Sequence, residues 1–534
     1  IPVLSALLDL PIEDNDFTRT LEAKERRNVL TATLEDCLKS AAAETPLLLV
    51  LEDIHWIDAL SNELLETLAR VSAVLPVCFV LAYRPPELAR SSAARVESLP
   101  HFTPVRLDQL TTSEIEQLIR AKLAQLYPAR SGALPPALVA QLTTRAEGNP
   151  FYTEELLNYL RDRGIDPYDD AGADALDLPS SLHALVLSRM DRLNETQKVA
   201  LKAASVIGRL FSLSWLYGYY PAVGAVERIK ANLEELAQLD LTPLDTPDPE
   251  LAYLFKHIVT RDVAYESLSY AMRAQLHEQL AQFVESQGAE RFLDLLAFHY
   301  SQSDNQAKQR EYLHKAGEAA RAAFANAAAV DYFTRLLPLL DDPRGALEVH
   351  LQRGRVLELQ GQWPEAEADY RAALALSGQI ADAAAEARCC RMLGTLCRLR
   401  GDYAAALPWL EQARAAFERL DDGDGLGQTL IEEGIVWLRQ GEYANARRAS
   451  EAGLALARAA ADPRAAALAL NTLAGIALNQ GDPETARGQF EESLALRREI
   501  GDRVGISVSL NNLGIVANRQ GDVDATRALF IECL

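Results

Sequence analysis

The sequence predicts a multidomain protein in which an α/β layer comes first and an all-α solenoid of helical repeats comes last. Two fully apolar runs, at 47–51 and 76–83, flank a stretch with helical periodicity at 61–71. This order is typical of buried parallel strands joined by a helix, and PVRL at 104–107 could form a third strand. In the second half, glycines recur every 40 residues, which indicates a repeat architecture. The 534 residues also exceed what a single hydrophobic core can organise.

The composition of the chain bears on which partners it can bind and on where in the cell it is expected. The formal net charge is −23, so nucleic-acid binding by this part of the chain is not expected. No apolar run approaches the roughly 18 residues that a membrane span needs, so no membrane association is expected. The six cysteines form no CxxC pair and no zinc-ligand spacing, and we interpret them as reduced core residues of a cytoplasmic protein.

The repeat is punctuated by residues that end and start helices. A glycine followed by Asp, Glu or Gln recurs at Gly361, Gly401, Gly441, Gly481 and Gly521, and an aspartate recurs at Asp382, Asp422, Asp462 and Asp502. Glycine can close a helix in the left-handed conformation, and aspartate can cap the next helix. Each unit is therefore expected to hold two helices of about 17 residues. Small residues between them, such as Gly394, allow the paired helices to approach closely.

These units resemble the tetratricopeptide repeat over residues 310–534. The resemblance is carried by Leu-Gly before the closing glycine and by the aromatic residues Trp363, Tyr403 and Tyr443 after it. The period is longer than the family's usual value, which indicates longer helices. The resemblance implies a concave surface that binds a protein or peptide, although the repeats could instead only space other domains. DDGDG at 421–425 lacks the ligand spacing of an EF-hand and falls on a turn between repeats.

The stretch LLLVLEDIHWID at 47–58 places two carboxylates, Glu52 and Asp53, directly after the first apolar strand, and Arg84 follows the second. Because ligands of doubly wound sheets bind at the carboxyl ends of strands, these side chains are candidates for a shared site. One carboxylate could hold Mg²⁺, the other could position an attacking water, and Arg84 could sense a terminal phosphate. Alternatively, the carboxylates cap the helix beginning near Ser61 and form an ion pair with Arg84.

Four stretches in this order resemble the STAND class of signal-transducing ATPases of the AAA+ lineage. They are EDIHWID, the GNPF-containing segment 143–160, the segment 181–211, and YLFKHIVTRDVAYESL within 253–285. The resemblance covers about residues 1–300 and is nearest to bacterial regulators in which the ATPase precedes tetratricopeptide repeats. Many such relatives carry a class III adenylate/guanylate cyclase at the N-terminus, and relatives of this kind bind ATP or ADP with Mg²⁺.

This resemblance implies roles for individual residues. Glu52 and Asp53 would be the Walker B acids, which bind the metal and act in hydrolysis, and Arg84 would be the sensor arginine. Many relatives have Asp where this chain has Glu52, and the longer side chain could move the metal.

The same resemblance implies a second set of nucleotide contacts. Gly148, Asn149 and Pro150 would form the GxP turn, with the proline against the adenine. Residues 179–300 would be a winged helix in which His257 contacts phosphate. Alternatively, His257 is a buried structural histidine.

A phosphate-binding P-loop would need GxxxxGK[ST], and none of the nine lysines follows a glycine. We therefore expect that the loop lies upstream of Ile1, that the chain is a fragment, and that it binds ATP weakly and is inactive by itself. The expected domains are a nucleotide-binding part (1–108), a helical lid (109–178), a winged-helix-like domain (179–300) and the solenoid (301–534).

The resulting hypothesis is an ATP-dependent signalling regulator. Ligand or protein sensing by the repeats would control an ATP/ADP switch, an output domain outside the chain and ligand-dependent oligomerisation. A nucleotide cyclase is the favoured output. The alternatives are a non-catalytic scaffold with a relic ATPase module, or a LuxR-like transcription regulator whose DNA-binding domain lies outside the chain.

Overall fold

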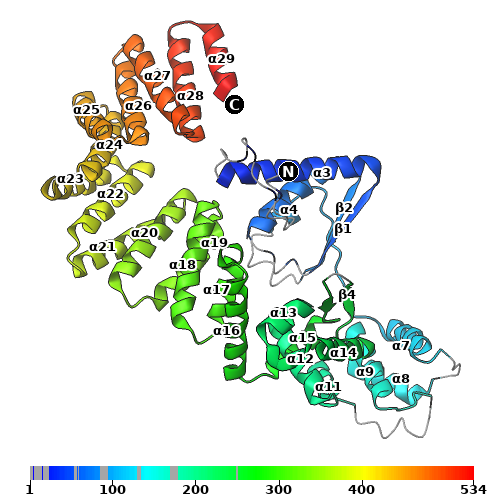
Figure 1. Ribbon diagram of the computed structural model, residues 1–534. Helices are drawn as coiled ribbons and strands as arrows, with labels where there is room; N and C mark the ends of the chain where they lie inside the picture. The colour runs from blue at the N-terminus through cyan, green and yellow to red at the C-terminus, as the bar shows by residue number, and fades with distance from the viewer. Residues whose placement is uncertain are drawn as a thin grey trace. The chain divides into compact units, whose positions relative to one another are not determined.

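The computed structural model describes residues 4, 12, 15, 18, 23–52, 54, 57, 59–83, 94–128, 134–168, 178–247 and 250–533. Its contacts divide the chain into two compact units. The first unit comprises Ile1–Asp14 with Arg27–Ala316, and the second comprises Asn15–Arg26 with Gly317–Leu534. Figure 1 shows the first unit in blue to green and the solenoid of the second in green to red.

The first described elements of regular length form a small parallel α/β layer. Its elements are α3 (Ala23–Glu44), β1 (Leu47–Leu51), α4 (Ala59–Ser72) and β2 (Val77–Leu81). Strands β1 and β2 pair in parallel, with Leu47 opposite Val77 and Leu51 opposite Leu81. Leu65 and Ala69 of α4 are buried in a cluster that includes Phe79 and Leu81 of β2. The predicted order of strand, helix and parallel strand is therefore confirmed.

Two details of this layer differ from the sequence prediction. Leu48, Val50 and Val80 are 64%, 54% and 44% exposed, so the strands are not buried on both faces. In the described part of the chain, α4 covers one face of the pair, and alternate side chains point to the other. The run 104–107, expected as a third strand, has no regular secondary structure, and Leu107 is 94% exposed.

A helical segment follows the α/β layer. It contains the short α6 (Ala94–Glu97) and the longer α7 (Thr112–Leu126), α8 (Pro136–Ala146) and α9 (Pro150–Asp162). A capping box starts α7: Thr111 accepts from the N–H of Glu114, and the Glu114 carboxylate accepts from the N–H of Thr111 at 2.8 Å. Apolar residues of the three longer helices, including Ile115, Leu142 and Leu156, share one core.

The next segment combines helices with a small antiparallel sheet of order β3-β5-β4, as a winged helix does. Phe211 and Tyr253 are paired across β3 and β5, and both are buried. The elements are α11 (Leu182–Asp191), α12 (Glu195–Ile207), β3 (Leu210–Ser212), α13 (Leu213–Tyr219), α14 (Val226–Gln238), β4 (Leu244–Thr246), β5 (Ala252–Leu254), α15 (Ile258–Glu266), α16 (Tyr270–Ser286) and α17 (Leu293–Ser301).

The predicted solenoid is confirmed as a continuous stack of antiparallel helix pairs (Figure 1). It is preceded by α18 (Gln306–Ala322) and α19 (Asn326–Leu336). The pairs are α20 (Pro343–Leu359) with α21 (Trp363–Gln379), α22 (Ala383–Leu399) with α23 (Tyr403–Leu420), α24 (Gly423–Gln440) with α25 (Tyr443–Ala459), α26 (Pro463–Asn479) with α27 (Pro483–Glu499), and α28 (Arg503–Arg519) with α29 (Val523–Cys533).

The punctuating residues act as predicted. Gly441 closes α24 in the left-handed conformation, with φ of 82°. Asp382, Asp422, Asp462 and Asp502 each accept a hydrogen bond from a backbone N–H in the first turn of the following helix. A Cβ added at Gly394 would lie 2.7 Å from the Leu410 side chain, so only glycine allows this approach of α22 to α23.

Two chain-wide features complete the description. Among the described residues, no helix is both long enough and apolar enough to cross a membrane. The six cysteines are free, but only Cys389 and Cys390 are fully buried, whereas Cys37 and Cys78 are exposed. The interpretation of all six as core residues is therefore wrong for Cys37 and Cys78, because Cys78 lies in the half-exposed strand β2 and Cys37 on the exposed side of α3.

Candidate functional site

The predicted acidic pair is described only in part. Glu52 directly follows β1, and its side chain is 64% exposed. Its carboxylate forms an ion pair with Arg209, at 3.6 Å between Oε2 and Nη1. Asp53 and Arg84 lie outside the described residues. Glu52 is therefore joined to an arginine that the sequence analysis did not select.

The backbone conformation of the predicted turn at 148–150 requires a glycine at position 148. Gly148 has φ of 76°, and an added Cβ would lie 2.8 Å from Gln109 Cβ and from the Leu110 carbonyl oxygen. The N–H of Leu110 donates to the Gly148 carbonyl at 2.9 Å. Asn149 caps α9 by accepting from the N–H of Tyr152 at 3.1 Å, and Pro150 is the first residue of that helix. The turn is thus fixed between α9 and the segment that enters α7.

His257 lies beside this turn. Its ring contacts the ring of Phe151, with centroids 3.7 Å apart and planes at 38°. Its Nε2 is buried and has no hydrogen-bond partner among the described residues. Burial, together with the positive charges of Lys256 and Arg209, lowers the pKa of His257 to about 4, although Glu154 and Asp240 act in the opposite direction. The imidazole is therefore neutral at pH 7, with one polar nitrogen available to a ligand.

Charged side chains surround His257. Lys256 forms an ion pair with Asp240 at 2.7 Å. Lys122, which is 8% exposed, lies 3.9 Å from carboxylate oxygens of both Asp240 and Glu154. These contacts join α7, α9 and the loops around the small sheet.

The structure therefore brings several predicted residues together. Arg209 directly precedes β3 and accepts at its carbonyl from the N–H of Phe255, so it lies near the end of β5 that leads to His257. Arg209 forms an ion pair with Glu52, and its positive charge lowers the pKa of His257. Phe151, which follows the turn at 148–150, contacts the ring of the same histidine. Sequence analysis missed Arg209 and Phe151. Phe151 is the last residue of the GNPF stretch named above, whereas no motif or periodicity in the sequence around Arg209 indicates a functional role.

This arrangement has the groups needed to bind a planar anion. Phe151 offers an aromatic ring, His257 offers a buried nitrogen, and the cationic groups of Arg209 and Lys256 lie nearby, each paired with one carboxylate. Arginine and lysine are common phosphate ligands in proteins. The residues present therefore fit a phosphate-bearing ring compound at the junction of α9 and the small sheet.

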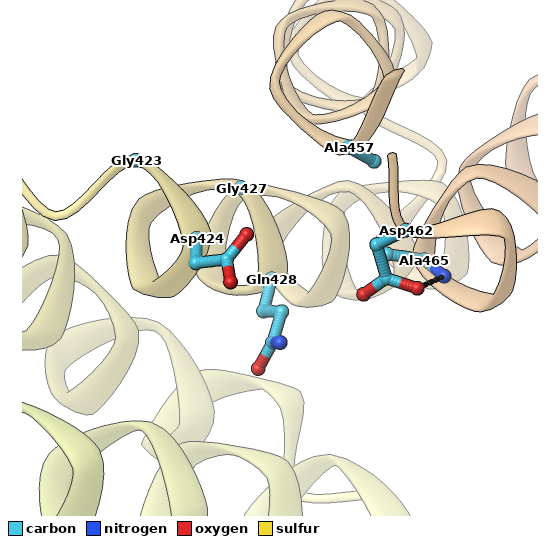
Figure 2. Close-up of a pocket in the computed structure, with 7 residues that line it drawn as sticks. All are labelled: Gly423, Asp424, Gly427, Gln428, Ala457, Asp462 and Ala465. Carbon is cyan, nitrogen blue, oxygen red and sulfur yellow. Dashed lines mark hydrogen bonds between the residues drawn. The ribbon is translucent and has the colours of Figure 1, made fainter. Parts of the chain in front are cut away.

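A pocket in the solenoid is lined by residues of α24, the end of α25 and the start of α26 (Figure 2). It is lined by Asp424, Gln428, Asp462 and small residues. Asp462 accepts from the N–H of Ala465 at 3.0 Å, so its carboxylate already serves as a helix cap. Among the described residues, no group of three His, Cys, Asp or Glu side chains is placed to hold a metal ion. The pocket is therefore explained by the turn between repeats.

Two known families match separate parts of the chain. Residues 5–80 match the AAA ATPase domain family, and residues 345–419 and 464–534 match the tetratricopeptide repeat family. The chain thus joins an AAA-type ATPase segment to a tetratricopeptide solenoid, and this predicted combination is confirmed.

Individual proteins share parts of this architecture. An uncharacterized protein of Rhizobium meliloti (strain 1021) is 27% identical over 273 residues, which are 50% of this chain and 25% of that protein. The chain therefore spans only a quarter of that relative's length.

Two solved structures are also similar. One is a STAND protein with a tetratricopeptide repeat sensor from Pyrococcus horikoshii, at 13% identity and a TM-score of 0.46, covering 96% of this chain and 72% of that one. The other is NprR in complex with its cognate peptide NprX, at 16% identity and a TM-score of 0.37, covering 48% and 76% of the two chains.

Proposed function

We propose that this chain is part of an ATP-dependent signal-transduction regulator of the STAND class. The solenoid receives a protein or peptide, and this event shifts a switch between ADP-bound and ATP-bound states. The switch controls an output domain, for which a nucleotide cyclase is the favoured candidate. Such a switch requires the solenoid ligand to bind one state more tightly than the other.

One observation carries this proposal. The turn at 148–150 and His257, selected as nucleotide contacts, converge through the Phe151–His257 contact. They do so in a chain that also matches the AAA ATPase family and carries tetratricopeptide repeats. The buried, unpartnered Nε2 of His257 supports a ligand at this junction, because a buried polar atom without a partner costs about 1–3 kcal/mol.

The residues would act as follows. Pro150 and Phe151 would hold the adenine, and His257 with Arg209 would contact phosphate. Glu52 and Asp53 would bind Mg²⁺, which would polarise the terminal phosphate, and Asp53 would orient the attacking water. The ion pair between Glu52 and Arg209 joins the acidic segment to Arg209, which directly precedes β3 of the small sheet. Loss or gain of a phosphate charge would therefore change the electrostatic energy of both the segment that contains Glu52 and the segment that contains Arg209 and His257.

The rival function is a non-catalytic scaffold in which the ATPase segment is a relic. The sequence contains no GxxxxGK[ST], and Glu52 stands where many relatives have aspartate. In the scaffold reading, Glu52 has only its structural ion pair with Arg209.

Replacement of Asp53 distinguishes the two functions. In the natural full-length polypeptide that contains this chain, Asp53→Asn is expected to retain ATP binding and to lower ATP turnover by at least about tenfold, since positioned bases contribute 10²–10⁴-fold. Phosphate release under single-turnover conditions is the measurement. Asp36→Asn, at an exposed position of α3, is the control and should leave turnover unchanged. Equal, measurable turnover in all three proteins would remove Asp53 from the catalytic role, whereas no turnover in the native protein would favour the scaffold.

A further inference from the structure

The ring of His257 is not oriented by a hydrogen bond. In many functional histidines, one ring nitrogen bonds to a carboxylate or a carbonyl group, and this bond sets the direction of the other nitrogen. His257 is the N-cap residue of α15, but its side chain makes no cap bond to that helix. In the part of the chain that the structure describes, its Nε2 also has no hydrogen-bond partner. The orientation of the ring therefore depends on packing.

The ring of Phe151 supplies this packing. It lies against the face of the imidazole, with 3.7 Å between the ring centroids and 38° between the ring planes. Centroids of aromatic pairs are usually about 4.5–7 Å apart, so this contact is a close one. The ring nitrogens of a histidine point outward in the plane of the ring. A side chain that fixes this plane therefore fixes the directions in which both nitrogens can form hydrogen bonds.

The charged neighbours of His257 cannot set the plane of its ring. Lys256 donates to Asp240 at 2.7 Å. Arg209 pairs with Glu52. These charges attract or repel the imidazole, but among the described residues none forms a hydrogen bond with it. Only the contact with Phe151 has the geometry that orients a ring.

Phe151 is not placed as a core residue. It is half-buried, whereas the following Tyr152 and Leu156 are buried in the core that α7, α8 and α9 share. Among the described residues of that core, Phe151 is not a member. A role in filling the hydrophobic core therefore does not account for its position.

The backbone at Phe151 is held by the turn that precedes it. Pro150 is the first residue of α9, and Asn149 caps this helix by accepting from the N–H of Tyr152 at 3.1 Å. Pro150, assigned above to the adenine, is thus the direct neighbour of the residue that packs on His257. One face of the Phe151 ring is occupied by His257, so a base can contact only the opposite face.

We propose that Phe151 is a positioning residue, which orients the imidazole of His257 toward phosphate and couples binding of the base to this phosphate contact. The inference rests on the proposed function, because it concerns the same nucleotide site. It adds a specific division of roles: Pro150 contacts the base, His257 contacts phosphate, and Phe151 acts on phosphate through His257. Displacement of the Phe151 ring would turn the imidazole away from the phosphate groups.

A double-mutant cycle in the natural full-length polypeptide tests this role. Its members are the native protein, Phe151→Leu, His257→Ala and the combination of the two, and isothermal titration calorimetry gives the affinity for Mg-ADP. We expect Phe151→Leu to weaken binding at least about fivefold, which is about 1 kcal/mol. In the His257→Ala background, the same substitution should change the affinity by less than about twofold, because the ring that Phe151 orients is then absent.

Two further variants separate orientation from folding. Phe151→Tyr keeps an aromatic ring and should bind Mg-ADP within about twofold of the native protein. Phe298→Leu is the matched control, since it removes an aromatic ring that contacts a different histidine, His299, with centroids 5.1 Å apart. It should leave Mg-ADP binding unchanged. If urea unfolding shows that Phe151→Leu does not fold, Phe151→Met takes its place in the cycle.

Two results would overturn the proposal. One is equal Mg-ADP affinity in Phe151→Leu and the native protein. The other is an equal loss of affinity from this substitution in both backgrounds, because a residue that only contacts the base or supports the fold acts independently of His257. Failure of the native protein to bind Mg-ADP would reject the proposed function and this inference together. Binding by the native protein with either of the first two results would reject this inference alone.

Discussion

Arg189 of α11 and Glu155 of α9 form a buried ion pair, with 2.5 Å between Nη1 and Oε2 and both side chains 2% exposed. Arg189 also donates to Asp162 at 2.9 Å and to the Leu239 carbonyl at 2.6 Å. Burial lowers the pKa of Arg189, but the two carboxylates outweigh this effect and raise it. One guanidinium group thus joins the helical segment that holds the turn at 148–150 to the segment that holds His257.

Removal of this guanidinium group is expected to destabilise the first unit strongly. Arg189→Met leaves Glu155 buried without its partner, and breaking a buried pair in this way costs about 3–5 kcal/mol. Urea unfolding followed by circular dichroism measures the loss. Arg70→Met is the control, because Arg70 pairs with Glu66 on the exposed surface of α4 and should cost less than about 1 kcal/mol. Similar losses in the two variants would show that the buried pair adds no particular stability.

Gly148→Ala tests the geometry of the turn. The added methyl group would meet Gln109 and Leu110 at 2.8 Å, and the residue would keep φ of 76°. Gly164→Ala is the matched control, since Gly164 has φ of 65° but nothing within 4 Å of an added Cβ. Backbone strain alone should destabilise both variants by about 1 kcal/mol. The steric clash should add about 1–3 kcal/mol for Gly148→Ala only. Equal urea midpoints would contradict the close packing of the turn.

A buried histidine pair predicts loss of stability in mild acid. His277 and His299 are each 1% exposed and are joined at 2.8 Å between their Nδ1 atoms. Burial lowers the pKa of His277 to about 4 and that of His299 to about 3, from an ordinary value of 6.5. Between pH 6.5 and 4 the unfolded chain therefore binds protons that the folded chain does not, and the folded state loses stability as the pH falls.

The expected loss is a few kcal/mol between pH 7.5 and 4.5, because one pKa unit corresponds to about 1.4 kcal/mol. Urea midpoints measured across this range give the slope. His277→Asn combined with His299→Asn should flatten it, whereas His183→Asn should not, since the His183 side chain is 54% exposed. A slope that survives the double substitution would assign the acid sensitivity to other groups.

The solenoid could be predicted from the sequence because its signals are local. Gly441 is needed where the chain turns left-handed, and Asp462 is needed where the first N–H groups of α26 lack partners. Each requirement concerns one turn of backbone and recurs every 40 residues. The length of the helices and the positions of the turns can therefore both be predicted from the repeat.

The sheet and the site could be predicted only in part. The apolar run at 47–51 predicted a strand, but the exposure of Leu48 and Val50 depends on which elements cover the second face. The turn at 148–150 and His257 were selected through family resemblance, whereas Arg209 and Phe151 were not. Arg209 contacts Glu52 and Phe151 contacts His257, and each pair is far apart in the sequence. Sequence periodicity does not predict contacts of this kind.

Binding of Mg-ADP to the natural full-length polypeptide tests the central claim most directly. Isothermal titration calorimetry should detect tight binding to the native protein, and His257→Ala should weaken it at least about tenfold by removing a phosphate contact, a change of 1.4 kcal/mol. His183→Ala, at an exposed position of α11, should bind as the native protein does. Absence of binding to the native protein, or equal affinity in His257→Ala, would contradict a nucleotide-driven switch.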